Sequence, residues 1–134
     1  MVCAGWGGAI HMMPTVLVVD DSALIRRTLV TRFSSDGYEV REASSVQSAR
    51  AIDCDGFVCA ILDLQLGDGD GTDLAMALQA RRPSLPIAFF TGGGVPSLVE
   101  SARCRGPVFL KPDMNALLAW VRRIVRPSQP PPTK

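Results

Sequence analysis

Five polar side chains follow directly on apolar runs in this sequence, and together they could support chemistry on a phosphoryl group. Asp20 and Asp21 come after "TVLVV", Asp63 after "FVCAIL", Thr91 after "PIAFF" and Lys111 after "PVFL". Two like charges about 4 Å apart repel by roughly 4 kcal/mol at an effective dielectric constant near 20. Three carboxylates in one pocket therefore need a cation, and their oxygens suit Mg²⁺. A carboxylate nucleophile, a hard metal and a lysine are the equipment for phosphoryl transfer.

The apolar runs that precede these side chains predict five short β-strands. Three of the runs are continuous, as is typical of strands that are covered on both faces of a sheet. The predicted strands cover residues 15–19, 38–42, 57–62, 86–90 and 107–110.

Helical periodicity fills the segments between these strands. The first helix has Ser22 or Asp21 as its cap, and its other side carries Arg26 and Arg27 facing away from the sheet. Its predicted inward stripe is Leu24, Ile25, Thr28, Leu29 and Phe33. Further helices are predicted over 46–52 and 72–82, from Pro96 onward, and over 114–125. The predicted inward residues of the last helix are Leu117, Leu118, Val121, Ile124 and Val125.

Five strands that alternate with helices predict an α/β fold with a doubly wound, five-stranded parallel sheet and helices on both faces. Ligands of such sheets bind beyond the carboxyl ends of the strands. If the first, third, fourth and fifth strands are neighbours, the five polar side chains converge in one shallow crevice. One Asp, Thr or Lys at such a position is usually a helix cap or a solvated residue, but the coincidence of all five favours a functional site.

The composition is that of one globular domain. The chain has 134 residues with 14 basic and 13 acidic side chains, a net charge of +1. This balance gives no electrostatic footprint for nucleic acid or an anionic membrane. No apolar run approaches the roughly 18–20 residues that span a bilayer. We therefore expect a cytoplasmic protein with an extension over 1–13, one domain over 14–126 and a proline-rich, disordered tail over 127–134.

The four cysteines indicate neither a zinc site nor a disulfide framework. They form no CxxC pair, and one His cannot complete a usual zinc set. Cys59 lies inside an apolar run and is predicted to be a core residue.

The segments "VLVVDDS", "LDLQLGDGDG", "FFTGGG" and "FLKP" together resemble the receiver domain of two-component response regulators. The resemblance covers about residues 14–126 and implies a stand-alone, chemotaxis-regulator-like receiver with the (βα)5 flavodoxin-like fold. It also implies a signalling module that assists its own phosphorylation and dephosphorylation but is not an enzyme.

The resemblance assigns metal-binding roles to four residues. Asp20 and Asp21 would hold Mg²⁺ together with Asp63, and the main-chain carbonyl of Gln65 would be a further ligand.

The resemblance also assigns roles around the phosphoryl group. Asp63 would attack a phosphohistidine and become an acyl phosphate. Thr91 would donate to a phosphoryl oxygen, the Gly92 N–H would be another donor, and Lys111 would pair with Asp63 or the phosphoryl group. The Lys111–Pro112 bond is often cis in the family, which proline makes accessible at about 0.5–1 kcal/mol, and a cis bond would direct the lysine into the site.

Three departures from the family pattern concern the loops. Gly67 stands where the family often has proline, so we expect a more mobile loop. Val108 occupies the family's aromatic switch position, and alternation points the neighbouring Phe109 to the other face of the sheet. The segment "TGGG" is rich in glycine, so the loop into the fourth helix is expected to become ordered upon phosphorylation.

Rival interpretations assign the chain to other classes of protein. The "DGDGTD" segment is not an EF-hand, because positions six and twelve would be Asp73 and Gln79. A metal-dependent phosphohydrolase would need an acid where Gln65 stands. A receiver-like docking module that is never phosphorylated remains the alternative.

The partners that the resemblance implies are a sensor histidine kinase or histidine phosphotransfer protein and a downstream protein. We expect neither direct DNA binding nor an output domain after residue 126. In the family, the fourth helix, fifth strand and fifth helix commonly bind the downstream protein. Trp120 on the fifth helix is either a partner contact or part of the edge of the core.

Overall fold

The computed structural model describes residues 13–124, so the predicted tail and all of the predicted extension except Met13 lie outside the described residues. Its main feature is a five-stranded parallel sheet in the order β2-β1-β3-β6-β7. These strands are β1 (Thr15–Val19), β2 (Glu39–Ala43), β3 (Phe57–Leu62), β6 (Ile87–Thr91) and β7 (Val108–Leu110). The prediction that β1, β3, β6 and β7 are neighbours is therefore confirmed.

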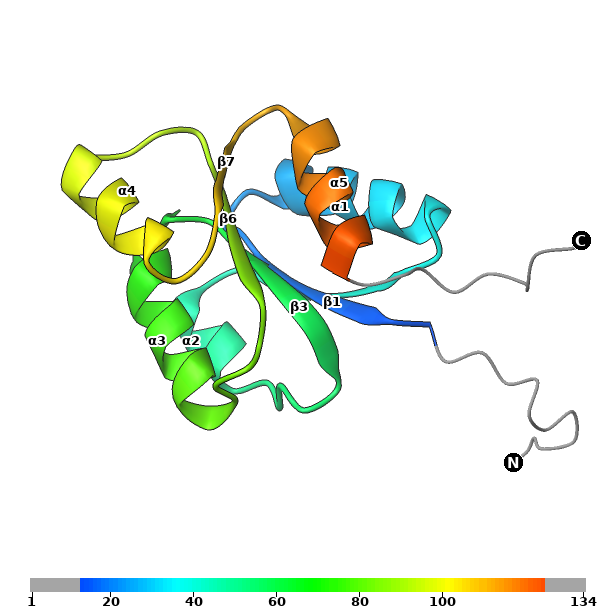
Figure 1. Ribbon diagram of the computed structural model, residues 1–134, viewed down its shortest axis with the longest axis horizontal. Helices are drawn as coiled ribbons and strands as arrows, with labels where there is room; N and C mark the ends of the chain where they lie inside the picture. Colours follow the sequence, from blue (N-terminus) through cyan, green and yellow to red (C-terminus); the bar gives the residue numbers. More distant parts are fainter. Residues whose placement is uncertain (1–12, 125–134) are drawn as a thin grey trace, which may run out of the picture.

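The described residues form five helices, which cover the sheet in two layers (Figure 1). They are α1 (Ala23–Ser35), α2 (Val46–Arg50), α3 (Gly71–Arg81), α4 (Pro96–Arg103) and α5 (Met114–Ile124). One buried cluster joins α1 and α5 to the sheet and includes Phe33 and Leu117. The other joins α2, α3 and α4 to the opposite face and includes Leu78 and Phe89. Continuous apolar strands such as β3 supply side chains to both clusters, as the sequence predicts.

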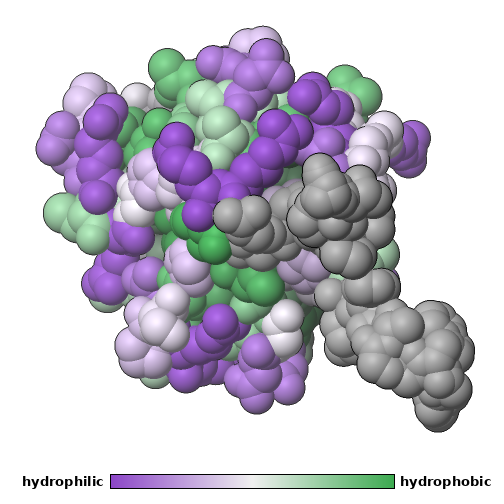
Figure 2. All heavy atoms as spheres, turned by 45° about the vertical axis from the view of Figure 1, so that its right-hand side comes forward, coloured by the Kyte–Doolittle hydropathy of each residue, from purple (hydrophilic) through white to green (hydrophobic). Residues whose placement is uncertain are grey.

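The surface of the α1 and α5 side mixes hydrophilic and hydrophobic residues (Figure 2). No described helix has both the length and the apolar character needed to cross a membrane. The thiol of Cys59 is fully buried, which confirms its place in the core, and burial raises its pKa to about 12.

Three details differ from the sequence prediction. Leu24, in the first turn of α1, is 73% exposed rather than inward, because α1 buries its later turns, through Leu29 and Phe33. Ile124 is likewise exposed at the last turn of α5, and Val125 lies outside the described residues. Arg26 does not face away, since it pairs with Glu42 at 3.1 Å (Nε to Oε1).

A short antiparallel hairpin follows β3 and was not predicted. Its strands are β4 (Gln65–Leu66) and β5 (Gly69–Asp70), so the turn consists of residues 67 and 68. The sequence predicts a mobile loop here, whereas the structure has a hydrogen-bonded hairpin that leads directly into α3. The Asp70 carboxylate caps α3 by accepting from the Asp73 N–H at 2.9 Å.

Candidate functional site

The carboxyl ends of β1 and β3 bring three carboxylates together. Val19 pairs with Leu62 in the sheet, and the Asp63 N–H donates to the Val19 carbonyl at 2.9 Å. One carboxylate oxygen each of Asp20, Asp21 and Asp63 lies within 4.8 Å of the others. Asp20 and Asp63 are buried, whereas Asp21 is exposed. Asp20 and Asp21 thus meet Asp63 because the ends of β1 and β3 are paired in the sheet.

Lys111 joins this cluster from the other half of the sheet. Thr91 pairs with Leu110, and the Lys111 N–H donates to the Thr91 carbonyl at 2.8 Å. This bond fixes the backbone from which the lysine side chain extends. Its Nζ lies 2.9 Å from Asp20 Oδ2 and 3.0 Å from Asp63 Oδ2. The Lys111–Pro112 peptide bond is cis. One ammonium therefore bridges the two buried carboxylates.

The pKa values of Asp20 and Lys111 are both raised, but for different reasons. Burial raises the pKa of Asp20, and a hydrogen bond from the Ser22 N–H and the contact with Lys111 only partly offset this. Burial opposes the charged form of Lys111, but hydrogen bonds to Asp20 and Asp63 outweigh it and raise the pKa of Lys111. The ammonium alone thus does not fully compensate the buried carboxylate of Asp20.

The donor set fits a hard divalent cation. Three carboxylate oxygens converge, and Asp20, whose pKa burial raises, gains from a further positive charge. Gln65 starts the hairpin beside these acids, and its N–H donates to Asp63 Oδ1 at 3.3 Å. The residues present are therefore compatible with Mg²⁺.

Thr91 ends β6 and is only 1% exposed. Its hydroxyl donates to the Gly93 carbonyl at 2.8 Å and accepts from the Gly93 N–H at 3.4 Å. Gly92 lies between them and is exposed, and a Cβ built there would meet no atom within 4 Å. The hydroxyl is thus engaged with the loop that leads into α4.

The neighbouring residues Val108 and Phe109 of β7 lie on opposite faces of the sheet. Val108 packs against the α2, α3 and α4 cluster, whereas Phe109 packs against the α1 and α5 cluster, as alternation predicts. The rings of Phe109 and Trp120 are 6.4 Å apart. Trp120 therefore packs at the edge of the core.

Two residues with contacts at the site were not found from the sequence. The guanidinium of Arg26 donates to the Asp20 carbonyl at 2.5 Å. The carboxylate of Asp68, in the hairpin turn, accepts from the N–H groups of Val46 and Gln47. Asp68 lies more than 20 positions from Val46 and Gln47, so no local pattern could have revealed that contact.

Comparisons with known proteins agree with this geometry. Residues 16–119 match the family model described as response regulator receiver domain. The chain is 30% identical to the photosynthetic apparatus regulatory protein RegA of Rhodovulum sulfidophilum over 89% of this chain and 67% of the relative. It is also 30% identical to the response regulator protein PilR of Pseudomonas aeruginosa over 85% of this chain but only 26% of that relative.

Solved structures resemble most of the chain. A CheY-like response regulator receiver domain protein from Methanospirillum hungatei superposes with a TM-score of 0.77 at 25% identity, covering 84% of this chain and 93% of that one. The chemotaxis protein CheY4 of Vibrio cholerae gives 0.75 at 26% identity, covering 85% and 100%. The fold is thus the α/β flavodoxin-like fold of such receivers.

Proposed function

Since this chain belongs to the response regulator receiver domain family of two-component systems, we propose that it is a phosphoacceptor receiver of a phosphorelay. The observation that carries this proposal is the meeting of Asp20, Asp63 and Lys111 at the ends of three strands. We further propose that residues 14–126 make up the receiver unit and that it acts in the cytoplasm as a signalling protein rather than an enzyme.

Asp63 is the proposed phosphoacceptor. One oxygen of its carboxylate attacks the phosphorus of a phosphohistidine, a P–O bond forms, the P–N bond breaks, and the histidine nitrogen recovers a proton. The donor is a sensor histidine kinase or a histidine phosphotransfer protein. Hydrolysis by water then returns the carboxylate and releases inorganic phosphate.

The other residues neutralise and orient charge around this reaction. Asp20, Asp21, Asp63 and the carbonyl of Gln65 would hold Mg²⁺, which when bound neutralises charge on the phosphoryl oxygens. Lys111, already 3.0 Å from Asp63 Oδ2, orients that carboxylate and pairs with the charge that arrives on it. The N–H of Gly92 donates to a phosphoryl oxygen.

Thr91 is the proposed reporter of phosphorylation. When its hydroxyl donates to a phosphoryl oxygen, it leaves the Gly93 carbonyl to which it now donates. That exchange changes the loop into α4 and hence the surface of α4, β7 and α5. Val95 and Leu110 are exposed there at 57% and 60%, which supports a downstream protein partner for this surface.

Labelling of Asp63→Asn tests the proposal. With Mg²⁺ and radiolabelled acetyl phosphate, or a phosphorylated histidine phosphotransfer protein, we expect acid-stable, hydroxylamine-sensitive label on the wild type and none on this variant. The substitution keeps the size of the side chain, so the circular dichroism spectrum should not change. Asp55→Asn, at an exposed carboxylate, is the control and should label normally.

The outcomes separate the two candidate functions. Undiminished labelling of Asp63→Asn would refute the assignment of the phosphoacceptor. A wild-type chain that takes no label and does not respond to beryllofluoride with Mg²⁺ would instead be a receiver-like docking module. Both predicted functions share the fold, so only the covalent step distinguishes them.

A further inference from the structure

Asp68 lies at the tip of the hairpin, yet its carboxylate is bound to another element. Its Oδ1 accepts from the Val46 N–H at 2.8 Å and its Oδ2 from the Gln47 N–H at 3.0 Å. These two N–H groups begin α2 and have no acceptor within the helix. The same bonds lower the pKa of Asp68, so the carboxylate is charged at neutral pH and the bonds are charge-assisted.

Under this contact, the backbone of the hairpin lies close to the side chain of Val46 in α2. A Cβ built on Gly69 would lie 3.1 Å from Cγ2 of Val46. Val46 itself packs against the α2, α3 and α4 cluster. The hairpin therefore has both a hydrogen-bonded and a packed connection to the first turn of α2.

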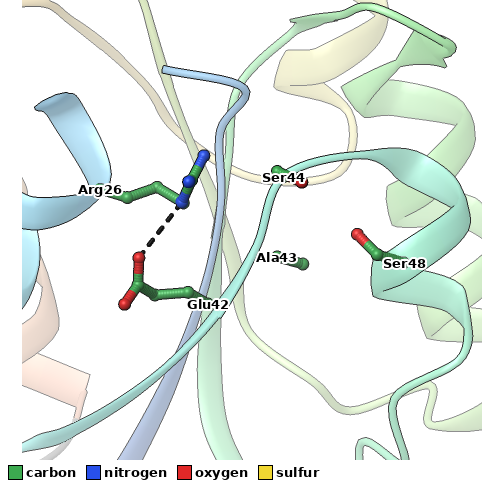
Figure 3. A pocket seen from close by; sticks show the side chains of 5 residues that line it. All are labelled: Arg26, Glu42, Ala43, Ser44 and Ser48. Carbon is green, nitrogen blue, oxygen red and sulfur yellow. Dashed lines mark hydrogen bonds and ion pairs between the residues drawn. The ribbon is translucent and has the colours of Figure 1, made fainter. Parts of the chain in front are cut away.

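On its other side, that first turn has less support. A cavity of about 320 Å³ lies between α1, the end of β2 and α2, and is lined by Arg26, Glu42, Ala43, Ser44 and Ser48. Figure 3 shows Arg26 of α1 and Ser48 of α2 on opposite sides of it. The first turn of α2 is thus held from the hairpin side rather than from the α1 side.

The contact joins the two halves of the acidic site. On one side, the Asp20 N–H donates to the Ala43 carbonyl at 3.1 Å, and α2 begins three residues after Ala43. On the other side, the hairpin presents the Gln65 N–H to Asp63. Asp68 connects α2 to the hairpin and so closes a ring of contacts from Asp20 to Asp63.

We infer that Asp68 is a positioning residue, which clasps the hairpin to α2 and thereby holds Gln65 in place against Asp63. The inference rests on the proposed function in so far as Gln65 contributes a carbonyl to Mg²⁺. The part that concerns the Gln65 N–H and the Asp63 carboxylate does not depend on the metal.

Asp68→Ala and Ser45→Ala form a matched pair of variants. Both weaken the start of α2, because Ser45 is the N-cap of α2 and accepts from the Ser48 N–H at 3.0 Å. Only Asp68→Ala also releases the hairpin. We expect Asp68→Ala to raise the dissociation constant for Mg²⁺ about tenfold, as loss of outer-shell support does at other metal sites, and Ser45→Ala to leave it unchanged.

Asp68→Asn separates position from charge. Its amide oxygen still accepts a hydrogen bond from α2, although the negative charge is gone. We expect it to lose much less Mg²⁺ affinity than Asp68→Ala. A loss as large as that of Asp68→Ala would show a long-range charge effect and would overturn the inference.

Two measurements on the full chain test whether Asp68 positions Gln65. Calorimetric titration with Mg²⁺ gives the affinity, and amide hydrogen exchange by NMR gives the protection of the Gln65 N–H without metal. Faster exchange at Gln65 in Asp68→Ala but not in Ser45→Ala supports the clasp, whereas equal exchange in both variants overturns it. A wild-type chain that binds no Mg²⁺ would count against the proposed function, while exchange at Gln65 would still decide the role of Asp68.

Discussion

Lys111 dominates the charge balance of the site. Its ammonium contacts Asp20 Oδ2 and Asp63 Oδ2, which belong to two of the three carboxylates that converge here. A bound lysine cation and a bound metal cation therefore compete for charge on these carboxylates. Because the lysine side chain is 19% exposed, solvent moderates this competition.

Lys111→Met keeps the length of the side chain but removes its charge. We expect Mg²⁺ affinity to rise roughly 3- to 10-fold, because a competing cation is lost, while phosphoryl labelling falls about 100-fold, as on loss of one charged donor to a transition state. Calorimetry and labelling with acetyl phosphate measure the two effects.

The control is Arg123→Met, which removes the same charge from an exposed position on α5 and should change neither quantity. Weaker Mg²⁺ binding in Lys111→Met would contradict the competition and would mean that the lysine instead orders the carboxylates.

The elements around the site differ in how firmly they are fixed. The start of α4 has no side-chain cap, and its N-terminal turn opens with Pro96, which lacks an N–H. Gly93 before it has φ of +143°, a conformation that side chains rarely adopt. With no side-chain cap and with the Thr91 hydroxyl bonded to the loop at its entrance, α4 is the element best suited to move when that hydroxyl changes partner.

The start of α3 is fixed by contrast. A Cβ built on Gly71 would lie 2.2 Å from the Asp63 carbonyl oxygen, so only glycine lets the helix begin this close to β3.

Gly71→Ala should therefore push α3 away from the end of β3. We expect a loss of about 1–3 kcal/mol in the free energy of unfolding, as for other overpacked sites, together with reduced labelling of Asp63. Urea denaturation measures the first effect. Gly67→Ala, in the hairpin that precedes α3 and with no atom within 4 Å of a built Cβ, should stay within about 0.5 kcal/mol of the wild type. Equal losses in both variants would contradict the close-approach argument.

At the scale of the molecule, the site lies at the ends of strands that pack against the hydrophobic clusters on both faces of the sheet. β1, β3, β6 and β7 each contribute side chains to the cluster on either face, or pack against it. A ligand that binds the site in the folded state but does not bind the unfolded chain must therefore stabilise the whole domain.

We expect Mg²⁺ at 100 times its dissociation constant to raise the free energy of unfolding by about 2.7 kcal/mol, and a chelator to reverse the gain. Urea denaturation followed by circular dichroism measures it. Asp21→Ala should lose most of this gain, yet without metal it should unfold within about 0.5 kcal/mol of the wild type, because Asp21 is exposed. A full gain in this variant would exclude Asp21 as a ligand.

The sequence by itself determined the sheet, the two helical layers and the strand ends at which the acids, Thr91 and Lys111 stand. It could do so because continuous apolar runs, caps and breakers act over a few residues and are visible in a local pattern. The β1 and β3 bounds were predicted to the residue, and no predicted end of another strand or helix shifted by more than two positions.

Only the tertiary structure decided which partners the polar groups take. Lys111 bridges Asp20 and Asp63, Thr91 bonds to its own loop, and Asp68 binds α2 rather than the helix that follows it. Leu24 is exposed, because α1 buries only its later turns. Such contacts form between segments up to 91 positions apart, as from Asp20 to Lys111, and they depend on strand register and helix placement, which no short stretch of sequence encodes.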